Sequence, residues 1–183
     1  PHAIPALNNL AYIALRESDN ARALNIIDQV LQIEPDEPIA HSLATRCWFE
    51  LESDPMLRFH CEATLKGYLE LVKLGDPVEP DYADRAFPFV LQALLIAEDN
   101  AGIITLYDRT PNRDWSPMEL TWAGVAHFNR GRINEAHLIW RRVVRTAKFG
   151  PARTYAKLAQ LVLADEVLPF TLDYDILVGD EEA

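Results

Sequence analysis

Apolar residues recur at steps of three and four in nearly every segment from Ile4 to Leu163, and this spacing constrains the fold more than any other feature. Strand-like alternation is hard to find, and glycine is scarce, with seven residues in a chain of 183. Apolar stripes at helical spacing are buried when helices pack on one another. The sequence therefore predicts an all-helical fold.

Turn-forming residues interrupt this periodicity and divide the chain into helices of about 12 to 20 residues. Ser53 or Asp54 is expected to cap one helix, and Ser116, which precedes Pro117, is expected to cap another. The interruptions fall at residues 18–20, 34–36, 53–55, 75–77, 99–100, 110–112, 129–131 and 149–151.

The helices between these breaks come in pairs, and similar residue types occupy matching positions of different pairs. The first pair carries Leu7, Leu10, Ala11, Ala14, Ala23, Ile27, Val30 and Pro35. The same positions of the last pair hold Leu120, Ala123, Gly124, His127, Ala136, Trp140 and Val143. Weaker units begin near Pro38 and Asp84, where His41 and Phe87 match Leu7. The small residues Gly124 and Ala136 predict close helix contact, with Trp140 in the large position.

This pattern resembles the tetratricopeptide repeat, in which each unit is a helical hairpin. The resemblance covers about residues 4 to 150 and implies a right-handed superhelix, an alpha-alpha solenoid of about four hairpins. The expected hairpins span residues 4–37, 38–72, 84–116 and 117–150, and a capping helix over 151–164 completes a repeat domain over 1–164. Other helical-hairpin repeats remain open. Residues 165–183 are expected to form an acidic, partly extended tail.

The first helix of each hairpin lines the concave groove in proteins of this kind, so its outward face is the candidate binding surface. At 100° per residue, the side opposite the partner helix displays aromatic, arginine and amide side chains together. Such a mixture suits an extended polypeptide, although packing against neighbouring repeats or the tail is the alternative. The candidate groove residues are Asn9, Tyr12, Arg16, Leu43, Arg46, Arg85, Phe89, Gln92, Trp122 and Asn129.

Opposite charges separate near the end of the chain. Residues 130–157 contain eight bases and one acid, whereas residues 165–183 contain seven acids and no base. Helical spacing places Arg141, Arg145 and Lys148 on the solvent side of their helix, where they form a basic ridge. A solubilising face that attracts the acidic tail, or an external anionic partner, accounts for this ridge.

No motif for catalysis, nucleotide binding or metal binding is found, so no enzyme activity, cofactor or metal is expected. The seven glycines form no phosphate-binding loop, and the two cysteines, Cys47 and Cys61, are not spaced as a metal-binding pair. Cys61 occupies an inward position and is predicted to be a buried, inert thiol. His127 also occupies an inward position and is predicted to be a core or interhelix hydrogen-bonding residue.

The charge and the cysteine content limit the expected cellular location and the classes of partner. The net charge of −11 disfavours nucleic acid as a partner, although RNA at the basic ridge stays open as a minor alternative. No apolar stretch approaches the roughly 20 residues that cross a bilayer, so no membrane insertion is expected. Two cysteines and no leader pattern favour a reducing, cytoplasmic location. Because the first residue is Pro1, the chain is expected to be a piece of a longer protein.

Two functions are therefore considered. The first is a non-catalytic protein-protein interaction scaffold that binds an extended polypeptide in its groove, with self-association through that surface left open. The second is a regulatory or sensor segment of a larger enzyme or transcription regulator, whose acidic tail docks on the basic ridge.

Overall fold

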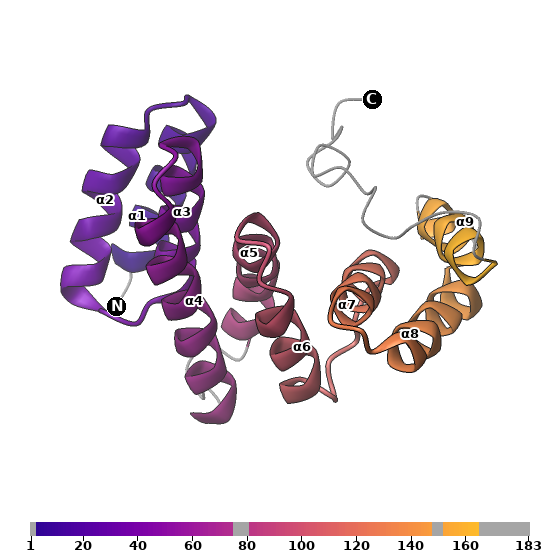
Figure 1. Cartoon of the computed structure of the whole chain (residues 1–183). Coiled ribbons are helices and arrows are strands. Elements are labelled where there is room, and N and C mark those ends of the chain that lie inside the picture. Colours follow the sequence, from indigo (N-terminus) through magenta and orange to yellow (C-terminus); the bar gives the residue numbers. More distant parts are fainter. Residues whose placement is uncertain (1–2, 75–80, 148–151, 165–183) are drawn as a thin grey trace. The chain divides into compact units, whose positions relative to one another are not determined.

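The structure is a computed structural model that describes residues 3–74, 81–147 and 152–164. These residues form α-helices and contain no β-strand, which confirms the predicted all-helical fold (Figure 1). The helices are α1 (Ala3–Arg16), α2 (Asn20–Ile33), α3 (Pro38–Glu50), α4 (Asp54–Leu74), α5 (Tyr82–Ile96), α6 (Asn100–Arg109), α7 (Pro117–Asn129), α8 (Ile133–Thr146) and α9 (Ala152–Leu163).

The chain divides into two compact units, Pro1–Gly102 and Ile103–Ala183, which are described separately. Helices α1 and α2, α3 and α4, and α7 and α8 each pack as a pair, whereas the bounds of the four hairpins stay predictions. The predicted single repeat domain over 1–164 would include residues of both units, and it stays a prediction. The tail 165–183 lies outside the described residues.

Four turns that follow the first helix of a pair share one backbone conformation. In each turn a residue with positive φ follows the helix, and the next amide bonds back to a carbonyl five residues earlier, as in a Schellman motif. The positive-φ residues are Ser18, Glu52, Glu98 and Gly131. They follow the matching helix positions Leu7, His41, Phe87 and Leu120 at a constant interval, so the turns recur with the spacing that the sequence predicts for the hairpins.

The shared turn predicts opposite effects of glycine at two positions. Glu52→Gly is expected to raise the free energy of unfolding by about 0.5–1 kcal/mol, because Glu52 has a φ of 54° that glycine adopts without strain. Gly131→Ala, at a φ of 73°, is expected to lower it by about 1 kcal/mol. Urea denaturation measures both changes. The matched control is Glu62→Gly inside α4, which is expected to destabilise by about 1 kcal/mol; equal effects of Glu52→Gly and Glu62→Gly would contradict the prediction.

In the first unit, α3 is the central helix, and it contacts α1, α2, α4 and α5. Side chains all around α3 are buried as a result, including polar ones such as Ser42 and Thr45. Helix α4 approaches the loop before α3 closely, since a Cβ on Gly67 would overlap the carbonyl oxygen of Asp36. The repeat pattern predicts that Leu10 faces the partner helix, but Leu10 is 44% exposed, because α1 packs on α2 and α3 through other residues.

In the second unit, α8 packs on α7 and α9, and Trp140 anchors the contact with α7. The Trp140 side chain is 1% exposed, and its indole Nε1–H donates to the carbonyl of Thr121 at 3.3 Å. A Cβ on Gly124 would overlap the indole ring, so glycine leaves the space that this ring fills. The predicted close helix contact at Gly124 is confirmed, and so is the Ser116 cap, whose hydroxyl accepts from the Glu119 amide.

Candidate polypeptide-binding surface

A single buried carboxylate connects three helices of the first unit. Glu37 is 1% exposed and caps α3, where its oxygens accept from the amides of Ile39 and Ala40. The same carboxylate accepts from Asn8 Nδ2 of α1 at 3.0 Å and from the hydroxyl of Tyr82 at the start of α5. Glu37 thereby holds α1, α3 and α5 together at one end.

The environment of Tyr82 keeps its hydroxyl protonated. Burial raises the pKa of Tyr82, and the nearby charge of Glu37 and the hydrogen bond to it raise that pKa further. The phenol is therefore a hydrogen-bond donor throughout the neutral pH range. Because Glu37 supplies the matching acceptor, the network fixes the position of α5 relative to α3.

Aromatic rings of α1 and α5 contact each other beside α3. The rings of Tyr12 and Phe89 contact edge to face, with centroids 6.3 Å apart, and the hydroxyl of Ser42 on α3 donates to the carbonyl of Phe89 at 2.6 Å. Because α1 and α5 both contact α3 and also meet through these two rings, the three helices form one contiguous surface.

The predicted groove residues of the first unit lie on these three helices, but they differ in exposure. Leu43 is 3% exposed, so its side chain packs inside the unit, which is the alternative that the sequence left open. Arg46, Phe89 and Gln92 are half-buried. The exposed members are Asn9, Tyr12, Arg16 and Arg85.

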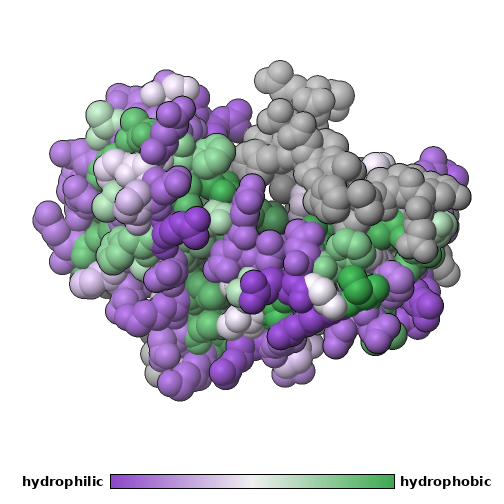
Figure 2. All heavy atoms as spheres, in the orientation of Figure 1, coloured by the Kyte–Doolittle hydropathy of each residue, from purple (hydrophilic) through white to green (hydrophobic). Residues whose placement is uncertain are grey.

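Charged groups on this surface are partly engaged. Arg46 pairs with Glu50 at 3.5 Å, and Glu50 also accepts from Asn20 at 2.9 Å. The guanidinium of Arg85 lies over the ring of Tyr82, 5.6 Å from its centroid. The surface of α1, α3 and α5 thus presents aromatic rings, guanidinium groups and amides close together. Figure 2 shows mostly hydrophilic residues, with apolar groups between them, on the visible face of the molecule.

The remaining predicted groove residues belong to the second unit. Trp122 is 7% exposed, and its indole nitrogen is buried without a hydrogen-bond partner among the described residues. Asn129 is exposed at the end of α7. Both residues lie on α7 of the second unit, whereas the surface of α1, α3 and α5 belongs to the first unit.

A buried imidazole pair lies between α3 and α4, and nothing in the sequence indicates it. His41 Nδ1 and His60 Nδ1 are 2.8 Å apart, and His41 Nε2 lies 2.8 Å from the carbonyl oxygen of Pro35. Burial lowers the pKa of His60 to about 4, and the neighbouring His41 lowers it as well. In the described ranges, no group of three or more His, Cys, Asp or Glu side chains is arranged to hold a metal ion.

The two thiols and the third buried histidine of the described residues are enclosed by the helices around them. Cys61 is 2% exposed, which confirms its predicted burial, and burial raises the pKa of both Cys47 and Cys61 to about 12. His127 is 4% exposed, as expected, but both of its ring nitrogens lack a hydrogen-bond partner within the described part of the chain. Its ring instead contacts Tyr107 edge to face, with centroids 6.0 Å apart.

Two of the three residues of the predicted basic ridge lie within the described part of the chain. Arg141 and Arg145 are exposed on α8, as predicted, and Lys148 lies outside the described residues. Over residues 3–74, 81–147 and 152–164, no helix is long and apolar enough to cross a membrane.

Comparison with known protein families, curated proteins and solved structures finds no match to this chain. The resemblance to tetratricopeptide repeats therefore stays a prediction from the residue pattern.

Proposed function

We propose that this chain is a non-catalytic interaction scaffold of tetratricopeptide-like hairpins that binds an extended polypeptide. The hairpins are proposed to continue as a right-handed superhelix, with the first helices on its concave side. Support comes from the four similar turns at the hairpin spacing and from the contact of α1, α3 and α5 in sequence order.

One observation carries this proposal. Tyr12, Arg16 and Arg85 reach solvent beside the half-buried Phe89 and Gln92, on helices that Glu37 holds in fixed positions. Aromatic side chains supply contact area at low entropic cost, and arginines pair with carboxylates of a peptide. The surface is therefore suited to an acidic or mixed peptide in an extended conformation.

Selection of random displayed peptides on the intact chain tests the proposal. The selected peptides are expected to bind Tyr12→Ala and Arg16→Glu about tenfold more weakly, since an exposed aromatic or arginine anchor contributes roughly 1–2 kcal/mol. Isothermal titration calorimetry measures the affinities. Leu43 and Trp122 are unsuitable for this test, because their burial makes any substitution a test of folding.

Two exposed positions outside the surface of α1, α3 and α5 provide matched controls. Ile33→Ala on α2 and Arg58→Glu on α4 change similar kinds of side chain and are expected to leave the affinities unchanged. Thermal unfolding of each variant excludes loss of the fold. Equal binding to the wild-type chain, Tyr12→Ala and Arg16→Glu would reject this surface as the binding site.

A further inference from the structure

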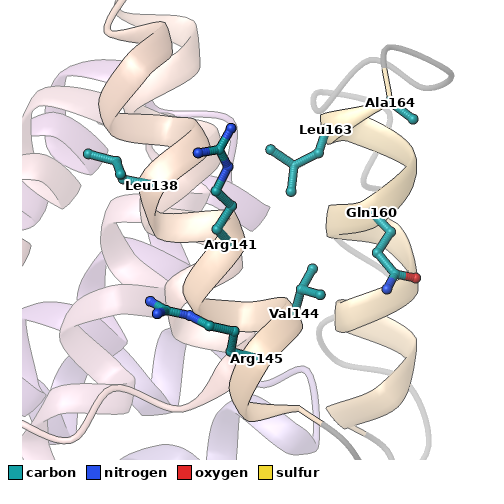
Figure 3. A pocket seen from close by; sticks show the side chains of 7 residues that line it. All are labelled: Leu138, Arg141, Val144, Arg145, Gln160, Leu163 and Ala164. Carbon is teal, nitrogen blue, oxygen red and sulfur yellow. The ribbon is translucent and has the colours of Figure 1, made fainter.

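An open groove lies between α8 and α9 in the second unit. It has a volume of about 650 Å³ and is lined by Leu138, Arg141, Val144, Arg145, Gln160, Leu163 and Ala164. In Figure 3 the side chain of Leu163 points from α9 toward α8, where the guanidinium of Arg141 lies next to it. None of these residues belongs to the α1, α3 and α5 surface, so an occupant of the groove is independent of the proposed function.

Two like charges line this groove, and no carboxylate of the described residues pairs with them. Arg141 and Arg145 are four residues apart on one helix, and such a like-charged pair is unfavourable in isolation. The ion pairs within the described ranges involve other basic groups, among them Arg22, Arg46, Lys66, Lys73 and Arg113. The groove therefore favours an occupant that carries at least two carboxylates.

The rest of the lining is apolar and partly open to solvent. Leu138 is 64% exposed, which is the largest exposed fraction among the exposed large apolar side chains of the described residues. Val144 is half-buried, and Gln160 adds an exposed amide. A suitable occupant therefore alternates acidic and apolar side chains.

We propose that residues 165–183 of the same chain dock in this groove, with the carboxylates of Asp173 and Asp175 on the guanidinium groups of Arg141 and Arg145. This segment holds seven acids and no base, and it includes Leu172, Tyr174 and Ile176 between and beside those two aspartates. It is also continuous with Ala164, which lines the groove. Charge and pattern thus match the lining.

The spacing of the charges supports this pairing. In an extended segment, residues two apart point to the same side and lie roughly 7 Å apart, so Asp173 and Asp175 share a side. Residues four apart on a helix rise about 6 Å, so Arg141 and Arg145 present their charges at a similar separation. Leu172, Tyr174 and Ile176 take the opposite side of such a segment, where the apolar lining is available.

The segment is long enough to reach both arginines. Asp173 lies nine residue steps after Ala164, which allows a reach of about 30 Å when extended. Helix α8 has 14 residues and a length of about 21 Å. A covalently attached segment has an effective concentration in the millimolar range, so exposed ion pairs of modest strength are sufficient for docking.

A spin label on the segment tests this arrangement in the full chain. Leu177→Cys introduces the labelling site, and the native thiols do not compete, because Cys47 and Cys61 are 0% and 2% exposed. Docking is expected to broaden the amide NMR signals of Arg141, Val144, Gln160 and Leu163. Raising the salt to about 1 M is expected to reduce this broadening, since charges are then screened within about 3 Å.

Charge variants separate a specific pairing from general attraction. Arg141→Glu with Arg145→Glu is expected to lower the docking equilibrium constant by about tenfold or more, the range that two exposed ion pairs provide. Adding Asp173→Lys and Asp175→Lys to that variant is expected to restore the broadening. Arg130→Glu with Arg132→Glu, two exposed arginines outside the groove, is the matched control and is expected to lower the docking constant less.

Three results would overturn the proposal. Absence of broadening at the groove amides would show that the segment does not dock there. An equal decrease of the docking constant in the variant at Arg141 and Arg145 and in the control would show general electrostatic attraction without a specific site. Broadening in an isotope-labelled chain without a spin label, mixed with spin-labelled chains and growing with concentration, would show docking between two copies instead.

Discussion

Replacing Glu37 by alanine is expected to lower the free energy of unfolding by roughly 3–5 kcal/mol, the range for removing one member of a buried, charged hydrogen-bond network. The substitution leaves Asn8 Nδ2, the hydroxyl of Tyr82 and the amides at the start of α3 without their acceptor. Each of these donors is then desolvated without compensation. Guanidinium chloride denaturation followed by circular dichroism measures the change.

A second carboxylate gives the control for this prediction. Glu62→Ala removes an exposed glutamate from α4 and is expected to change the stability by less than about 0.5 kcal/mol. Glu37→Gln is expected to fall between the two, because the amide keeps one acceptor oxygen but places a second donor among donors. A loss below about 1 kcal/mol for Glu37→Ala would mean that the three helices do not depend on this carboxylate.

Acid is expected to destabilise the protein through His60, by about 3 kcal/mol between pH 6.5 and pH 4. The folded state lowers the pKa of His60 from 6.5 to about 4, so in this window the unfolded chain binds a proton that the folded chain does not. Stability therefore falls as the pH decreases, by about 1.4 kcal/mol per unit, until the folded state also protonates near pH 4. Above pH 6.5 both states are neutral, and His60 adds no pH dependence.

A variant without this titration isolates the effect from that of the carboxylates. His60→Asn keeps a side-chain donor toward His41 Nδ1 and has no proton to gain. The difference in unfolding free energy between the wild type and His60→Asn is expected to grow in favour of the variant as the pH falls from 6.5 to 4. The rings that contact His60 are those of His41 and Phe59, and both are retained in the variant. Parallel pH profiles of the two proteins would exclude a depressed pKa.

The local features of this fold can be predicted from the sequence. Ser116 before Pro117 indicates a helix start, and the turns at residues 18, 52 and 131 fall where polar and glycine residues interrupt the apolar spacing. The close helix contact at Gly124 also follows from the repeat pattern, since a small residue at this position indicates that two helices approach each other closely. These features depend on residues within one hairpin.

The buried polar groups cannot be predicted in the same way. Glu37 is not a preferred capping residue, and nothing in its neighbourhood indicates that Asn8 and Tyr82 lie within hydrogen-bond distance. His41 and His60 belong to different helices, so their contact depends on how α4 rotates against α3. The repeat pattern places Leu43 in a groove, but α3 is enclosed by four helices and the residue is buried.

The sequence alone determined the helical class and the approximate positions of the turns, because helical periodicity and turn chemistry depend on residues only a few positions apart. The tertiary structure alone decided that α3 is buried on all sides, which polar side chains meet beneath the surface, and that Arg141 and Arg145 line a groove with α9. These outcomes depend on the distance and rotation between helices, and many different side chains at a helix surface are compatible with the same periodicity.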